Sequence, residues 1–396
     1  MSTALRLVPA PDPTPVAARD VAMIFGYTTW GGAVRRGMVH SEDRLTLELM
    51  GSSRVARLLV CNPYRSALAT AVRSVVGPHE ADFPATDTRH LYQPLRLRRS
   101  DPTRLHAIER ACAAYEARVR RAAERLGLHK PAIITTHPLL AGFADFDWAG
   151  PVTYYATDDL AAHPPLRDWW PAYAVAYARV RELGRRVVGV SAKAAGSVDP
   201  IGGVVVPNGI EPDEWLARSL PPAWFTALPG PRLLYVGTLD PRVEVEALAA
   251  LARSYPTASI VLVGRCPDPE HYASLRAYRN VTIAPPVPRS ELTALVAAAD
   301  VGLIPHVRDE QTEAMSPLKL YEYLAAGVPV AATDLPPIAP VWPERTALAR
   351  TPSDFPAAVA RALQTGRCAE RDRIRFIHAN AWERRFERLL DIALED

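Results

Sequence analysis

The stretch that decides the fold is DVGLIPHVRDEQTEAMSPLKLYEYLAAGVPVAATDLPP, residues 300–337. It predicts a buried strand over 301–304, a polar loop, a helix that begins at Ser316-Pro317 and a second strand from Val328. Two apolar strands joined through a helix pair in parallel, by a right-handed crossover. We therefore expect a parallel sheet covered by helices.

The same alternation of apolar runs and helical segments extends through most of the chain. The runs are continuous rather than alternating, which is typical of strands buried on both faces of a parallel sheet. The predicted strands are 21–26, 57–63, 132–136, 152–156 and 186–191 in the N-terminal half, and 232–239, 259–265, 280–286, 300–305 and 328–334 in the C-terminal half.

The length and the proline distribution predict two domains. A chain of 396 residues exceeds the ~250–300 residues at which one core usually stops growing. The last segment is predicted to form one long amphipathic helix that packs back across the junction. The expected parts are a loose arm (1–19), an N-terminal domain (20–206), a proline-rich linker (207–231), a C-terminal domain (232–372) and the final helix (373–396).

Composition excludes several classes of protein. Hydrophobic residues make up 48% of the chain and charged residues 22%, which is globular rather than disordered. The net charge is only +3, so nucleic acid is not expected as a partner. Four widely spaced cysteines without a CxxC motif predict reduced thiols. No signal peptide and no run of ~20 apolar residues are recognised, which predicts a soluble, cytoplasmic protein.

One helix leaves room for peripheral membrane contact. Residues 104–126 place apolar side chains on one helical face and arginines on the other. We favour a solvated face over a membrane-surface role for these arginines.

The start of the helix in the 300–337 stretch predicts an anion site. Ligands of parallel sheets bind beyond the carboxyl ends of strands, against helix N-termini. Ser316 is expected to cap the helix and Pro317 to be its first residue, which leaves the N–H groups near Leu318 for a diphosphate. Lys319 adds a cation, and Glu322, one turn further, suits a ribose diol. The alternative is that Lys319 and Glu322 form a surface pair at i,i+3.

The segment SPLKLYEYLAAGVPVAATDLP (316–336) resembles the nucleotide-sugar motif of GT-B glycosyltransferases, particularly the retaining GT4-like group. Further similarity lies in LLYVGTL, VLVGR, VPNGI (206–210) and the glycine-containing YTTWGG (27–32). The motif residues that match are Pro317, Lys319, Glu322, Leu324, Ala325, Gly327, Pro329 and Val330.

The resemblance implies two Rossmann-like domains that face a cleft. It implies transfer of a hexose-type sugar from a UDP- or GDP-linked donor to an acceptor hydroxyl, with retention and without a metal or cofactor. Lys319 and Arg242 would hold the donor pyrophosphate, and Glu322 the ribose. The family's second cation is absent from VGTLDPRVEVE, and Ala314 stands where the family often has an acidic residue.

The resemblance also assigns donor contacts outside the motif. Gly31 and Gly32 belong to the first loop, which faces the donor phosphates, and Gly237 follows the first C-terminal strand. Val287 would lie beside the nucleobase. The remaining assignments carry alternatives: Glu313 or Asp309 contacts the donor sugar or lies in a solvated acidic loop, Trp30 shapes the acceptor entrance or packs on a turn, and Asn208-Gly209 forms a turn near the hinge.

Two strands of the N-terminal half end in polar residues that face the expected cleft. His137 follows strand 132–136, where a family histidine contacts the transferred sugar; the alternative is a loop histidine without function. Asp158 and Asp159 follow strand 152–156, and either bind acceptor hydroxyls, act as a base, or cap a helix.

Other functions remain open. They are a sugar-nucleotide sensor without turnover and a nucleotide-sugar 2-epimerase on the same scaffold. A Rossmann dehydrogenase is disfavoured because no strand is followed by GxGxxG. The acceptor is undetermined between a small-molecule natural product and a polysaccharide or lipid-linked glycan.

Overall fold

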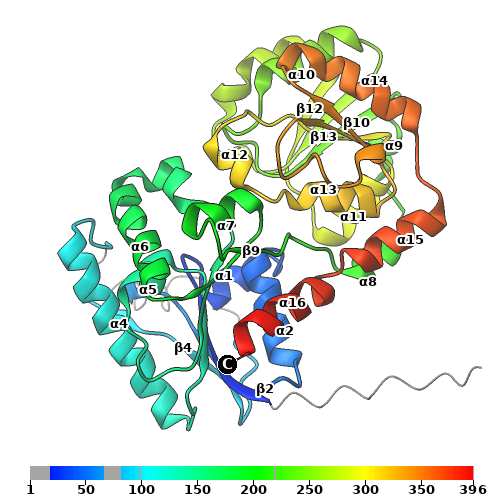
Figure 1. The fold of residues 1–396 in the computed structure, drawn as a ribbon. Coiled ribbons are helices and arrows are strands. Elements are labelled where there is room, and N and C mark those ends of the chain that lie inside the picture. Colours follow the sequence, from blue (N-terminus) through cyan, green and yellow to red (C-terminus); the bar gives the residue numbers. More distant parts are fainter. Residues whose placement is uncertain (1–17, 67–81, 98–99, 218–219, 396) are drawn as a thin grey trace, which may run out of the picture.

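The structure is a computed structural model in which residues 18–66, 82–97, 100–217 and 220–395 are described. The expected arm, 1–19, lies outside the described residues except for its last two positions. The chain forms two α/β domains connected by a linker and by the returning C-terminal segment (Figure 1).

The N-terminal domain is built on a seven-stranded parallel sheet in the order β4-β2-β1-β6-β7-β8-β9. All five predicted strands of this half are present. The strands are β1 (Arg19–Ile24), β2 (Val55–Cys61), β4 (Arg89–Tyr92), β6 (Ala132–Thr135), β7 (Val152–Ala156), β8 (Arg186–Gly189) and β9 (Val204–Val205), and β3 (Arg65–Ser66) pairs separately with β5 (Leu95–Arg96).

Helices cover both faces of this sheet. The predicted amphipathic helix is α4, and it buries its apolar face while its arginines face solvent. One face of the sheet packs on α2 and the C-terminal helix, and the other packs on α4, α5 and α6. The helical elements are α1 (Trp30–Arg35), α2 (Ser41–Gly51), α4 (Leu105–Arg125), α5 (Pro138–Phe143), η1 (Leu160–Ala162), η2 (Pro164–Trp169), α6 (Trp170–Glu182) and α7 (Ala192–Val198).

The C-terminal domain repeats this plan with a six-stranded parallel sheet in the order β12-β11-β10-β13-β14-β15. Its first strand follows the linker directly. All five strands predicted for this half are present, and β15 is additional. The strands are β10 (Arg232–Val236), β11 (Ser259–Val263), β12 (Val281–Ala284), β13 (Val301–Ile304), β14 (Val330–Thr333) and β15 (Thr346–Ala349).

Helices again cover both faces of the sheet. One core cluster includes α11 and α13, and the other includes α10 and α14. The polar loop expected after residue 304 contains a short helix, α12. The helical elements are α10 (Val245–Ser254), η3 (Pro269–Ala277), α11 (Arg289–Ala297), α12 (Glu310–Ala314), α13 (Leu318–Ala325), η4 (Pro343–Arg345), η5 (Pro352–Asp354) and α14 (Phe355–Thr365).

The C-terminal segment crosses back to the first domain, but as two helices rather than one. The helices are α15 (Glu370–Ala379) and α16 (Trp382–Leu394). The backbone of Ala381 bridges to Ile210 of the linker, which interrupts the helical hydrogen bonds between them. The apolar face of α16 is buried in the N-terminal core. The linker itself contains α8 (Pro212–Leu216) and α9 (Ala223–Thr226).

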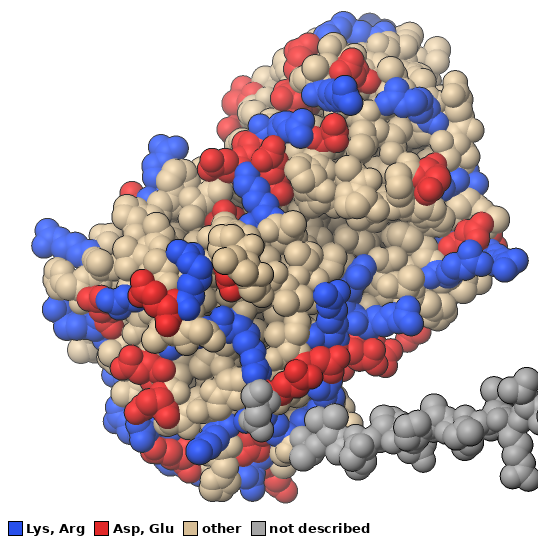
Figure 2. Space-filling view, viewed as in Figure 1, with Lys and Arg blue, Asp and Glu red and all other residues tan. Residues whose placement is uncertain are grey.

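The distribution of charged side chains on the surface and the state of the cysteines agree with what the composition predicts. Basic and acidic side chains are interspersed over the face shown in Figure 2. All four cysteines are free. None of the helices in the described ranges has both the length and the apolar character that crossing a bilayer requires.

Candidate active site at the interdomain cleft

A cavity of about 510 Å³ lies between the two domains at the carboxyl ends of both sheets. Its N-domain wall includes the start of α2 and the loop after β7; its C-domain wall includes the loop after β10 and the start of α13. Leu318, the first residue of α13, packs against the N-domain core. The amino end of α13 therefore lies at the domain interface and opens into the cavity.

The first turn of α13 offers backbone N–H groups without a side-chain cap. Pro317 is the N-cap residue, and no side chain of the described ranges accepts a hydrogen bond from the first turn. The prediction that Ser316 caps the helix is wrong by one position. The Ser316 Oγ accepts a 3.2 Å hydrogen bond from the backbone N–H of Asn208, and its carbonyl accepts one of 2.6 Å from the Asn208 amide. Ser316 therefore links the start of the helix to the interdomain linker.

Lys319 extends from that first turn into the cleft. Its Nζ donates a hydrogen bond of 2.8 Å to the Tyr235 hydroxyl and lies 4.0 Å from the centre of the Tyr235 ring. Burial, and then the positive charge of Arg242, lower the pKa of Lys319 to about 7. Among the described residues no carboxylate lies within ion-pair distance of Lys319. Its charge is thus available to a ligand.

Gly237, which follows β10, permits this placement of Lys319. Its φ of +135° is rarely adopted by other L-residues, and a Cβ there would lie 3.0 Å from the Lys319 Nζ. Glycine at this position therefore supports both the sharp turn after the strand and the path of the lysine.

Arg242 also lines the cleft, but with its charge shared. Its guanidinium donates hydrogen bonds to both carboxylate oxygens of Asp240, the shortest at 2.6 Å. This pairing raises the pKa of Arg242 and lowers the pKa of Asp240. The pair presents an oriented guanidinium with a reduced net charge to the cavity.

Glu322 lies one turn deeper in α13 and is almost fully buried. One of its oxygens accepts a hydrogen bond from Arg289, the first residue of α11. Arg289 also donates a 2.7 Å hydrogen bond to Glu214 of the linker. Glu214 in turn accepts a 2.5 Å hydrogen bond from Arg44 of α2. A ladder of four charges therefore connects the N-domain to the carboxylate predicted to bind ribose.

The two aspartates that follow β7 have different roles. Asp158 lines the cleft, and burial raises its pKa to about 6. Asp159 caps η1, because its side chain accepts a hydrogen bond from the backbone of Ala161 at 3.1 Å. Asp159 therefore has the capping role given above as an alternative, while Asp158 stays a candidate for binding the acceptor or acting as a base.

The acidic residues before α13 do not line the cleft. Glu313 forms ion pairs with Lys193 at 2.9 Å and with Arg308 at 3.2 Å, and the first of these joins the two domains. Asp309 caps α12 through a 2.7 Å hydrogen bond from the backbone of Thr312. Both residues thus have structural partners; the Asp309 cap is local in sequence, whereas the pairing of Glu313 with Lys193 joins distant segments.

Four residues expected at the cleft lie apart from it. Gly31 and Gly32 belong to the first turn of α1 rather than to a loop. The backbone N–H of Gly32 donates a hydrogen bond to the Thr29 hydroxyl. Trp30 is buried against Phe83, as its packing alternative requires. Val287 packs against the C-domain core, while the nearby Arg289 and Leu292 line the cleft.

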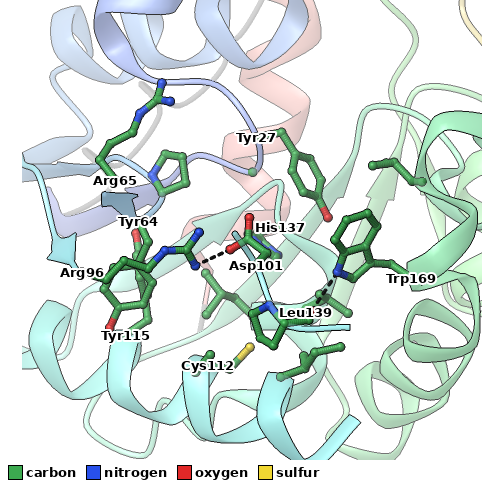
Figure 3. A pocket seen from close by; sticks show the side chains of 17 residues that line it. Tyr27, Tyr64, Arg65, Arg96, Asp101, Cys112, Tyr115, His137, Leu139 and Trp169 are labelled. Carbon is green, nitrogen blue, oxygen red and sulfur yellow. Dashed lines mark hydrogen bonds and ion pairs between the residues drawn. The ribbon is translucent and has the colours of Figure 1, made fainter. Parts of the chain in front are cut away.

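His137 lines a second cavity, which lies within the N-terminal domain (Figure 3). This cavity has a volume of about 250 Å³ and is bounded mainly by aromatic and aliphatic side chains. Burial lowers the pKa of His137 to about 4, and its Nδ1 has no hydrogen-bond partner among the described residues. The expectation that His137 faces the interdomain cleft is therefore corrected: it turns into the aromatic cavity beside the cleft.

The sequence analysis missed His306, which lines the cleft beside Lys319. It is buried, its Nε2 is 3.3 Å from the Lys319 Nζ, and its Nδ1 has no hydrogen-bond partner in the described part of the chain. Burial, and then the charge of Lys319, hold its pKa well below the usual range. Its position directly after a predicted strand is the signal that identified His137 and applies equally here.

In the described part of the chain, no group of three or more histidine, cysteine, aspartate or glutamate side chains is arranged to hold a metal ion. The cationic side chains that line the cleft are Arg242, Arg289 and Lys319.

Comparison with known proteins identifies the fold. Residues 230–365 match the family described as Glycosyl transferases group 1. Sucrose-phosphate synthase from Thermosynechococcus elongatus superimposes with a TM-score of 0.64, at 16% identity, over 94% of this chain and 97% of that one. The fold is GT-B.

Two further proteins are similar to this chain. The structure of Anabaena HepE in complex with UDP matches the GT-B fold with a TM-score of 0.60, at 14% identity, over 95% of this chain and 97% of that one. TuaH of Bacillus subtilis (strain 168), named as a teichuronic acid biosynthesis glycosyltransferase, is 28% identical over 137 residues. That alignment covers 33% of this chain and about a third, 34%, of TuaH.

Proposed function

We propose that this GT-B protein transfers a hexose from a nucleoside diphosphate sugar to an acceptor hydroxyl, with retention at the anomeric carbon and without a metal ion or cofactor. The observation that carries the proposal is the amino end of α13, which opens into the interdomain cleft with no side-chain cap and with Lys319 unpaired with a carboxylate among the described residues. We favour UDP over GDP because HepE, which shares the fold, was solved with UDP.

The cleft supplies stabilisation for the leaving group. As the bond between the anomeric carbon and the diphosphate oxygen breaks, the diphosphate leaves with the electron pair. Helix N–H groups, Lys319 and Arg242 would surround this developing negative charge with fixed donors and cations. Glu322, held by Arg289, has its other oxygen for the ribose hydroxyls.

The acceptor oxygen forms the new bond to the anomeric carbon and loses its proton. Asp158, on the N-domain wall, takes this proton in our proposal. Its raised pKa of about 6 suits a base near neutral pH. The retaining outcome rests on the similarity of residues 316–336 to the GT4-like motif.

The direct test is calorimetric titration of UDP and GDP, each with and without EDTA. We expect UDP to bind equally well in both conditions. Lys319→Ala should weaken binding about 10- to 100-fold, because a hydrogen bond to a charged group contributes about 1.5–3 kcal/mol. Lys130→Ala is the matched control, since Lys130 is exposed and precedes β6 at the opposite edge of the sheet.

Contrary outcomes are also defined. If neither nucleotide binds, or if EDTA abolishes binding, the proposed mechanism is wrong. If UDP binds but a panel of UDP-hexoses is neither hydrolysed nor transferred, the chain is a sensor. Release of an altered free sugar nucleotide without any acceptor would instead indicate a 2-epimerase.

A further inference from the structure

The aromatic cavity in the N-terminal domain is built differently from the cleft. Tyr64 and Tyr115 meet edge to face with ring centres 5.1 Å apart, and Trp169 stands on the opposite side (Figure 3). Aliphatic side chains of α4 and α5, such as Ile108 and Leu140, complete the walls. The cavity therefore presents mainly apolar surface to a ligand. Its charged lining residues are Arg65, Arg96 and Asp101, of which Arg96 and Asp101 form an ion pair at 2.5 Å.

The polar atoms of two of these aromatic residues, Tyr115 and Trp169, already form hydrogen bonds inside the protein. The Tyr115 hydroxyl donates to the Asn62 carbonyl at 2.8 Å, and the Trp169 indole donates to the Pro102 carbonyl at 2.9 Å. Because their polar atoms are occupied, these two rings offer only apolar surface. A planar apolar ligand would pack on them without leaving polar groups unpaired.

His137 supplies a polar group at this cavity. The centre of its imidazole ring lies 5.1 Å from that of Tyr27, with the two rings tilted by 33°. Neither ring nitrogen forms a hydrogen bond to another described residue. Burial keeps the ring neutral at pH 7, so one nitrogen donates and the other accepts. A neutral imidazole suits a ligand hydroxyl, and it does not attract an anion.

The cavity adjoins the cleft through one short segment. Thr136, the residue before His137, donates a 2.8 Å hydrogen bond to Glu42, which lines the cleft. The same hydroxyl accepts a 2.8 Å hydrogen bond from the backbone N–H of Gly26, which lines the aromatic cavity. Since β6 and β7 are neighbours, His137 and Asp158 also emerge at adjacent points of one sheet edge.

We propose that the aromatic cavity is the acceptor site and that it takes a planar, hydroxylated aromatic compound of about two fused rings, held by the rings of Tyr64, Tyr115 and Trp169 and by a hydrogen bond to His137. This inference rests on the proposed function, since an acceptor requires a donor. The volume of about 250 Å³ lies just below the ~300–1,000 Å³ of sites for drug-sized ligands, which suits a compound of this size.

The probe for this inference is 2-naphthol, followed by its fluorescence at pH 7. We expect saturable binding that Ala111→Phe weakens at least tenfold, because Ala111 of α4 lines the cavity and phenylalanine fills it. Ala113→Phe, on the exposed face of the same helix, is the matched control and should bind like the wild type. His137→Ala should weaken binding about 2- to 10-fold, the contribution of one neutral hydrogen bond.

UDP titration of the same variants separates the two proposals. UDP should bind all of them as it binds the wild type, which also shows that they fold. Failure of 2-naphthol to bind, equal binding by Ala111→Phe, or displacement of 2-naphthol by methyl α-D-glucopyranoside would overturn the aromatic acceptor site while UDP binding stands. Failure of UDP to bind the wild type would contradict the proposed function and remove the acceptor role with it.

Discussion

The interdomain cleft and the aromatic cavity lie side by side but differ in the side chains that dominate their walls. The cleft is formed by both domains and is lined by charged side chains. Among the described cationic side chains that line it, only Lys319 lacks a carboxylate partner. The aromatic cavity belongs to one domain, and its ring edges are hydrogen-bonded within the protein. The difference indicates that the donor is held by charge and helix geometry, and the acceptor by shape and apolar contact.

The largest expected effect comes from adding one methyl group to the cleft. Gly237→Ala places a side chain where φ is +135° and where a Cβ lies 3.0 Å from the Lys319 Nζ. We expect a loss of about 1–3 kcal/mol in the free energy of unfolding and at least tenfold weaker UDP binding. Denaturant unfolding and calorimetry measure the two effects.

The control for this substitution is Gly51→Ala at the end of α2, where an added Cβ meets nothing within 4 Å. Binding of 2-naphthol by Gly237→Ala should be unchanged. If 2-naphthol binding falls together with UDP binding, the two cavities are not independent.

The second prediction concerns pH. Because the pKa of Lys319 in the free protein is about 7, the lysine is protonated below that pH and loses its charge above it. UDP itself keeps a constant charge above pH 7, since a terminal phosphate has its second pKa near ~6. UDP affinity should therefore fall by up to tenfold per pH unit above pH 7.

Lys319→Arg is the control for the pH profile, because arginine stays protonated throughout this range. Its UDP affinity should be lower at pH 7 but nearly flat from pH 7 to 9. A flat profile in the wild-type protein would show that the charge of Lys319 does not govern donor binding.

The smallest expected effect comes from the charge ladder. Glu214→Gln removes the carboxylate that joins Arg289 to Arg44, while Glu322 keeps its own contact with Arg289. We expect UDP affinity to fall about 2- to 5-fold, in line with ~0.5–1 kcal/mol for a partly exposed pair. Glu246→Gln, which breaks an exposed pair with Arg253, should have no effect on affinity.

The sequence predicted the fold well because its strands are continuous apolar runs and most of them are buried in the interior of a sheet. All ten predicted strands are present. The strands that were missed, such as β4 with its sequence RHLY and β9 with two residues, are short and only partly buried. Edge strands of this kind lack the continuous apolar run on which the prediction depends.

The candidate site was predicted where its residues are close in sequence. Pro317, Lys319 and Glu322 lie within two helical turns, so their spacing fixes their geometry. The pairing of Glu313 with Lys193, 120 positions away, depends on how the domains meet. The place of His137 directly after a strand correctly predicted that it lies at the carboxyl edge of the sheet. Which of the two adjacent cavities its side chain enters depends on packing, which the sequence does not show.

The measurement that tests the central claim most directly is a crystal structure of the protein with UDP. We predict that the diphosphate lies at the amino end of α13, with phosphate oxygens within hydrogen-bond distance of the first-turn N–H groups and of the Lys319 Nζ. A diphosphate bound elsewhere in the cleft, or one held only by arginine side chains remote from that helix, would contradict the account.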